Sequence, residues 1–76
     1  MSRRDKLVIL RRADIFIVGH GPRRTRTVGK GERAYFFCDL GHDELGNPVS
    51  MIELGNGELA VAPLDLFRVC PSQAVT

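Results

Sequence analysis

The stretch Val49-Ser-Met-Ile-Glu-Leu-Gly-Asn-Gly-Glu-Leu-Ala-Val-Ala62 decides the fold of this chain. At its centre lies Asn56-Gly57, the pair that most readily adopts the positive φ angles of a type I′ hairpin turn. The residues on both sides of this pair are largely apolar and alternate in the way that half-buried strands do. We therefore predict two antiparallel strands, Val49–Leu54 and Glu58–Ala62, joined by a tight turn.

The residues that follow the hairpin are too irregular for a strand and too few for an α-helix. Pro63-Leu-Asp-Leu-Phe67 is predicted to form one 3-10 turn, and Arg68-Val69 a short closing strand. This order of hairpin, single turn and closing strand over residues 49–70 resembles that of SH3-like barrels. The resemblance implies a fold only, because SH3-like barrels include protein binders, nucleic-acid binders and enzymes.

Upstream of the hairpin, Arg33–Leu40 alternates between two kinds of side chain, as a strand with two different faces does. The more apolar set is expected to face the core: Ala34, Phe36, Cys38 and Leu40. The opposite face carries Arg33, Tyr35, Phe37 and Asp39. We therefore expect the Tyr35 and Phe37 rings to be partly exposed, as aromatic side chains at contact sites often are.

The first third of the chain holds two more runs typical of strands, Lys6–Leu10 and Asp14–Val18. Arg11-Arg12-Ala13 lies between them, either within one long bent strand or in a tight reversal. We favour a reversal or a bulge there, since one regular strand would place apolar side chains on both of its faces. The whole chain, residues 1–76, is thus predicted to be a single all-β domain with flexible tails at 1–5 and 71–76. The expected architecture is a five- or six-stranded SH3-like barrel or a compact two-sheet sandwich.

Charge is distributed unevenly along the sequence. Residues 1–33 hold ten basic and three acidic side chains, a net charge of +7, whereas residues 34–76 hold one basic side chain, Arg68, and six acidic ones, a net charge of −5. This division favours a polyanionic partner for one face of the domain. It equally allows head-to-tail association between copies of the chain.

The densest basic segment lies between glycines and leads into the strand that carries Tyr35. Guanidinium groups contact several phosphates at once, threonine hydroxyls add neutral hydrogen bonds, and an aromatic ring beside arginine stacks on bases. We therefore predict a small nucleic-acid-binding domain, with DNA and RNA both open as the ligand. The expected contacts are Arg23, Arg24, Arg26, Lys30, Arg33 and Tyr35.

The alternative prediction is a protein-interaction module that binds an acidic protein surface. Small size and divided charge fit an accessory protein, for example one of a phage, plasmid or other mobile element, and such a module can form homo-oligomers.

The sequence lacks the patterns that catalysis or metal binding requires. There is no nucleophile elbow, and Cys38-x-x-x-His42 supplies only two of the four ligands that structural zinc needs, with His20 and Cys70 each alone. A phosphate-binding loop ending at Gly29-Lys30 fails because Arg24 stands where its first glycine belongs. We therefore expect a protein that is not an enzyme and that binds no metal and no cofactor.

The apolar runs are also short. Leu7–Leu10 and Ile15–Val18 are far below the ~20 residues of a membrane span and do not form a signal peptide. Two cysteines are too few for a disulfide framework. We therefore expect a cytoplasmic protein with reduced thiols and no membrane partner.

Overall fold

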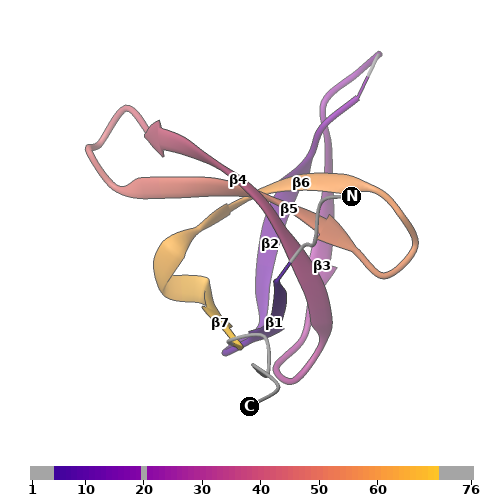
Figure 1. The fold of residues 1–76 in the computed structure, drawn as a ribbon. Coiled ribbons are helices and arrows are strands. Elements are labelled where there is room, and N and C mark those ends of the chain that lie inside the picture. The colour runs from indigo at the N-terminus through magenta and orange to yellow at the C-terminus, as the bar shows by residue number, and fades with distance from the viewer. Residues whose placement is uncertain (1–4, 20, 71–76) are drawn as a thin grey trace.

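The computed structural model describes residues 5–19 and 21–70, which form seven strands and one 3-10 helix (Figure 1). In chain order these are β1 (Lys6–Ile9), β2 (Ala13–Ile17), β3 (Arg24–Val28), β4 (Arg33–His42), β5 (Pro48–Leu54), β6 (Leu59–Pro63), η1 (Leu64–Leu66) and β7 (Phe67–Val69). The described part of the chain holds no α-helix, so the all-β prediction is confirmed. Of the predicted tails at 1–5 and 71–76, residues 1–4 and 71–76 lie outside the described residues, whereas the Asp5 carbonyl accepts a hydrogen bond from the Phe36 amide at 2.8 Å.

All seven strands belong to one antiparallel sheet, in the order β3-β2-β6-β5-β4-β1-β7. The sheet does not close into a barrel and there is no second sheet among the described residues, so the predicted SH3-like barrel and the two-sheet sandwich are not confirmed. Closure of a sheet requires its two edge strands to pair with each other. Here the edge strands are β3 and β7, and among the described residues β3 pairs with β2 and β7 with β1.

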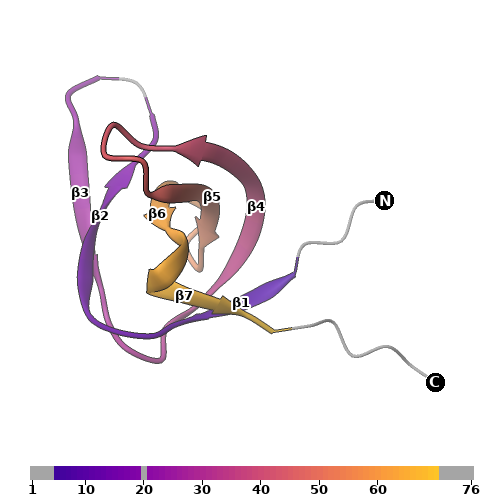
Figure 2. The ribbon, with the colours of Figure 1, turned by 90° about the vertical axis from the view of Figure 1, so that its left-hand side faces the viewer.

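The sheet is nevertheless strongly curled. Strands β6, β5 and β4 separate β2 from β1 in the sheet, yet only residues 10–12 separate them in the chain. Figure 2 shows the chain bending sharply between these two strands. The bend is held against η1, since the Leu10 amide donates to the Leu66 carbonyl at 2.7 Å and the Arg11 guanidinium donates to the Asp65 carbonyl at 2.9 Å. The predicted irregularity is therefore present as a bend within the sheet, and β1 and β2 do not form a hairpin.

The predicted hairpin forms, but its turn is not type I′, because Gly57 has a positive φ and Asn56 does not. Strands β5 and β6 pair from Val49 opposite Pro63 to Glu53 opposite Leu59, and Gly57 has a φ of 92°. The Gly57 amide donates to the Leu54 carbonyl at 2.9 Å, which closes the turn. The single 3-10 turn and the short closing strand are also confirmed, as η1 and β7.

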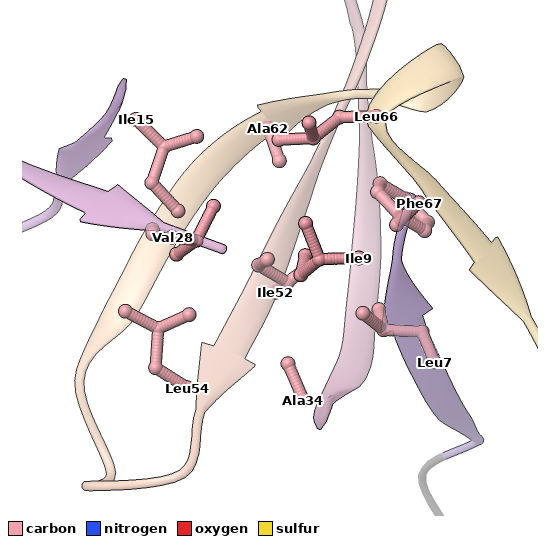
Figure 3. Packing of buried hydrophobic residues seen from close by; sticks show 11 residues of the cluster. Leu7, Ile9, Ile15, Val28, Ala34, Ile52, Leu54, Ala62, Leu66 and Phe67 are labelled. Atoms are coloured by element: carbon pink, nitrogen blue, oxygen red, sulfur yellow. The ribbon is translucent and has the colours of Figure 1, made fainter. Parts of the chain in front are cut away.

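The core lies on the inner face of the curled sheet (Figure 3). Ile52, on the middle strand β5, and Leu66, in η1, are fully buried in it. The cluster draws on β1 to β7 and on η1: it comprises Leu7, Ile9, Ile15, Val28, Ala34, Ile52, Leu54, Ala60, Ala62, Leu66 and Phe67. Because both ends of the chain contribute, the core requires nearly the whole sequence.

Strand β4 follows the predicted alternation only over its first half. Ala34 is buried and Phe36 packs against the core, but register shifts fall between Phe36 and Cys38 and again between Asp39 and Gly41. After the first shift Cys38 stands opposite Met51, on the outer face, while Asp39 stands opposite the buried Ser50 and accepts its hydroxyl hydrogen bond at 3.1 Å. The predicted inward positions of Cys38 and Leu40, which is 42% exposed, are therefore wrong, because a β-bulge reverses the faces of the strand.

Candidate functional site

Strands β2 and β3 form a two-stranded ribbon at one edge of the sheet. Strand β3 pairs only with β2 among the described residues, and the tip of the ribbon projects from the rest of the molecule (Figure 1). Three of the predicted contacts, Arg23, Arg24 and Arg26, lie at this tip and along β3. Because side chains alternate along a strand, they divide between the two faces of the ribbon.

Arg24 and Arg26 lie on the inner face and share one carboxylate. They stand opposite Ile17 and Ile15, and their guanidinium nitrogens reach the two oxygens of Glu58 at 3.5 Å and 3.2 Å. A hydrogen bond from the Asn56 side chain, together with the two arginines, lowers the pKa of Glu58 below its usual value. Glu58 is thus held as an anion, and the group of three keeps a net positive charge.

The outer face of the ribbon carries an aromatic ring that the sequence analysis missed. Phe16 is 50% exposed, and the Arg23 guanidinium carbon lies 5.6 Å from the centroid of its ring, a cation–π contact. The two side chains line an open pocket of about 540 Å³, together with the backbone of Gly19 and Gly21 and the side chain of Val61. The signal that could have revealed this ring is the alternation in β2, which directs Phe16 away from the buried Ile15 beside it.

An apolar row leads away from this ring across the outer face. Strand pairing places Cys38, Met51, Val61, Phe16 and Thr25 in register on β4, β5, β6, β2 and β3. Cys38, Met51 and Val61 are half-buried, so the row is a continuous but shallow surface that ends at the exposed ring.

The remaining predicted contacts lie elsewhere. Lys30 is in the turn between β3 and β4, Arg33 begins β4 opposite Val8, and Tyr35, 40% exposed, stands opposite Lys6. The predicted exposure of Tyr35 is confirmed, but the six predicted residues do not form one cluster. Strands β3 and β4 are consecutive in the chain yet four places apart in the sheet, so sequence proximity does not bring their side chains together.

The chain matches no protein-family model, no curated protein and no solved structure. Within residues 5–19 and 21–70, no three His, Cys, Asp or Glu side chains gather as metal ligands would, and Cys38 and Cys70 are free thiols. The same part of the chain has no helix with the length and apolarity of a membrane span.

Proposed function

We propose that this protein binds single-stranded nucleic acid at the tip of the β2–β3 ribbon. The observation that carries the proposal is the half-exposed Phe16 ring with the Arg23 guanidinium over it, at an open pocket. An exposed ring stacks on any base, and an arginine beside it contacts the adjoining phosphate. A single strand is the fitting ligand, because only unpaired bases offer their faces for stacking.

The backbone around the pocket allows close approach. A Cβ atom added to Gly19 or to Gly21 would meet no atom within 4 Å, so the space beside the ring is open. Thr25 stands opposite Phe16 on the same face, and its exposed hydroxyl lies where it can hydrogen-bond a phosphate or sugar oxygen. Aromatic, cationic and hydroxyl groups thus lie side by side on one surface.

Arg24 and Arg26 add to this site from the inner face. They share the single Glu58 carboxylate in exposed ion pairs, which are worth little and are weakened by salt. A nucleic-acid phosphate that approaches the ribbon replaces Glu58 at low energetic cost. The ribbon therefore offers three arginines to a polyanion.

The test is binding of a fluorescently labelled single-stranded oligonucleotide, measured by anisotropy over a range of salt concentrations. Stacking on an aromatic ring is worth about 1–3 kcal/mol per base, so Phe16→Ala should weaken binding by about five- to 150-fold. Arg23→Ala should reduce the slope of log affinity against log salt by about 0.7, the value for one phosphate contact on a single strand. The matched control is Leu45→Ala, which removes an 86% exposed apolar side chain from the turn between β4 and β5.

Two results would refute the proposal. One is an unaltered protein that fails to bind oligonucleotides at low salt. The other is a Phe16→Ala variant that binds as tightly as Leu45→Ala.

A second candidate function, a protein-interaction module, is favoured by the apolar row through Met51, Val61 and Phe16. Exposed apolar surface of this kind is typical of protein contacts, and the basic ribbon beside it suits an acidic protein surface or another copy of the chain. Cross-linking in the native host and sedimentation at two salt concentrations test this candidate. A captured protein partner or a salt-sensitive oligomer, with no binding of oligonucleotides, would favour it over the first.

A further inference from the structure

Strand pairing gathers a second set of basic residues on the outer face of β4, β1 and β7, far from the ribbon tip in the sheet. Val8 on β1 stands opposite Arg33 on one side and Arg68 on the other. Lys6, two residues before Val8, lies on the same face and stands opposite Tyr35. Arg68 comes from the acidic half of the sequence, so only the fold brings it to this surface.

The spacing of these residues suits a phosphate. Neighbouring strands lie ~4.8 Å apart, so the backbones of Arg33 and Arg68 are about 10 Å apart with Val8 between them. A pocket of about 400 Å³ opens here, lined by Lys6, Leu7, Val8, Arg33 and Cys70. Lys6 and Arg33 thus line the pocket beside apolar residues of β1, and Arg68 lies next to Val8 on the β7 side without lining the pocket itself.

The electrostatics of this surface differ from those of the inner face of the ribbon. On that inner face Arg24 and Arg26 each have a carboxylate oxygen within 3.5 Å, as does Arg11 in the bend between β1 and β2. In the part of the chain that the structure describes, no ion pair involves any of the three basic side chains on this surface, Lys6, Arg33 and Arg68. Like charges on adjacent strands repel one another, and a bound anion removes that repulsion.

We propose that Lys6, Arg33 and Arg68 form a second contact for the phosphate backbone of the same nucleic acid. This inference rests on the proposed function and adds a path for the ligand. The ribbon tip and strands β1 and β7 lie at opposite ends of the molecule in both views (Figures 1 and 2). The longest dimension of the molecule is 45 Å, which a stacked strand covers in about 13 nucleotides at ~3.4 Å each. A ligand that touches both surfaces is therefore longer than one that fills the Phe16 pocket alone.

The test compares variants in binding a labelled single-stranded 16-mer between about 50 and 200 mM salt. Arg68→Ala should lower the slope of log affinity against log salt concentration by about 0.7, the value for one phosphate contact on a single strand. Between 1 M and 50 mM salt, a slope of about 0.7 corresponds to a gain of about eightfold in affinity, so the variant should bind about eightfold more weakly at 50 mM salt. Arg68→Lys should restore the slope. The matched control is Arg12→Ala, which removes an exposed arginine from the bend between β1 and β2 and changes the net charge equally.

The possible outcomes are distinct. A loss in Arg68→Ala that Arg12→Ala does not share supports the second contact, and Arg33→Ala serves in its place if thermal denaturation shows that Arg68→Ala does not fold. Equal effects in Arg68→Ala and Arg12→Ala, with binding still dependent on Phe16, would overturn this inference and leave the proposed function standing. An unaltered protein that does not bind the 16-mer at 50 mM salt would overturn both.

Discussion

Glu58 limits the charge that the ribbon presents, so its removal is expected to strengthen nucleic-acid binding. Its two carboxylate oxygens lie 3.5 Å from an Arg24 nitrogen and 3.2 Å from an Arg26 nitrogen. Glu58→Gln keeps the size of the side chain and an oxygen for the Asn56 hydrogen bond, but removes the negative charge. Both guanidinium groups then become available to phosphates without first losing an ionic partner.

The magnitude follows from the number of arginines released. Each new contact with a single strand adds about 0.7 to the log–log salt slope, which corresponds to about eightfold in affinity at 50 mM salt relative to 1 M. Two contacts set an upper limit of about 60-fold and a slope increase of about 1.4. Partial release, in which only the better placed arginine engages, gives about half of that slope change.

The assay is the anisotropy titration with a labelled single strand, repeated at four or more salt concentrations. Glu44→Gln is the matched control, because it makes the same charge change in the exposed turn between β4 and β5, on a side chain with no ion pair to a described residue. If Glu44→Gln strengthens binding as much as Glu58→Gln does, the effect is one of overall charge and the reasoning about the ribbon is refuted.

Three further predictions concern the fold. Ile52→Val, in the fully buried centre of the sheet, should cost about 0.5–1.5 kcal/mol and lower Tm by several degrees, whereas Leu45→Ala should leave Tm unchanged in the same calorimetric scan. Gly57→Ala, at a φ of 92°, should destabilise the hairpin by about 1 kcal/mol in chemical denaturation; an equal loss in Gly55→Ala, where φ is not positive, would contradict the role assigned to the turn. The backbone amides of Asn47 and Leu45 donate hydrogen bonds to the Asp43 carboxylate, and the bond from Asn47 is the largest cause that lowers the pKa of Asp43 below its usual value of 3.8. The stability that Asp43 contributes is therefore complete above the unfolded-state pKa, and it is lost as pH falls through the lowered pKa of the folded state. Acid unfolding followed by circular dichroism should accordingly be shallower in Asp43→Asn, and identical acid profiles would count against this assignment.

The sequence predicted those parts of the fold that depend on neighbouring residues. Asn56-Gly57 marks the hairpin turn because Gly57 readily adopts the positive φ found there, although Asn56 does not adopt one and the turn is not the predicted type I′. Pro63 similarly introduces a single 3-10 turn. The faces of β4 were predictable only as far as Phe36. The bulge after it depends on how β4 pairs with β5, which no local pattern in Arg33–His42 reveals.

The basic character of this part of the chain was predictable from the sequence, but the spatial arrangement of its residues was not. The basic segment was evident from composition, and Arg23 is in contact with an exposed ring as a stacking site requires, but the ring is Phe16 and not Tyr35. Arg68 and Arg33 come to the same surface because their strands, β7 and β4, both pair with β1. These pairings join parts of the chain that are distant in sequence. Long-range register of this kind follows from the assembled sheet, so reading the sequence segment by segment could not supply it.

The position of β1 between β4 and β7 has a consequence for how the protein is made. During synthesis β1 is among the first strands to leave the ribosome, but its partner β7 and the buried Leu66 and Phe67 are among the last residues described. Pairing between sequence-distant strands is slow, because the chain must close a long loop before any contact compensates for the lost entropy. We therefore expect this domain to fold only after β7 has emerged from the ribosome, and to fold slowly for its size.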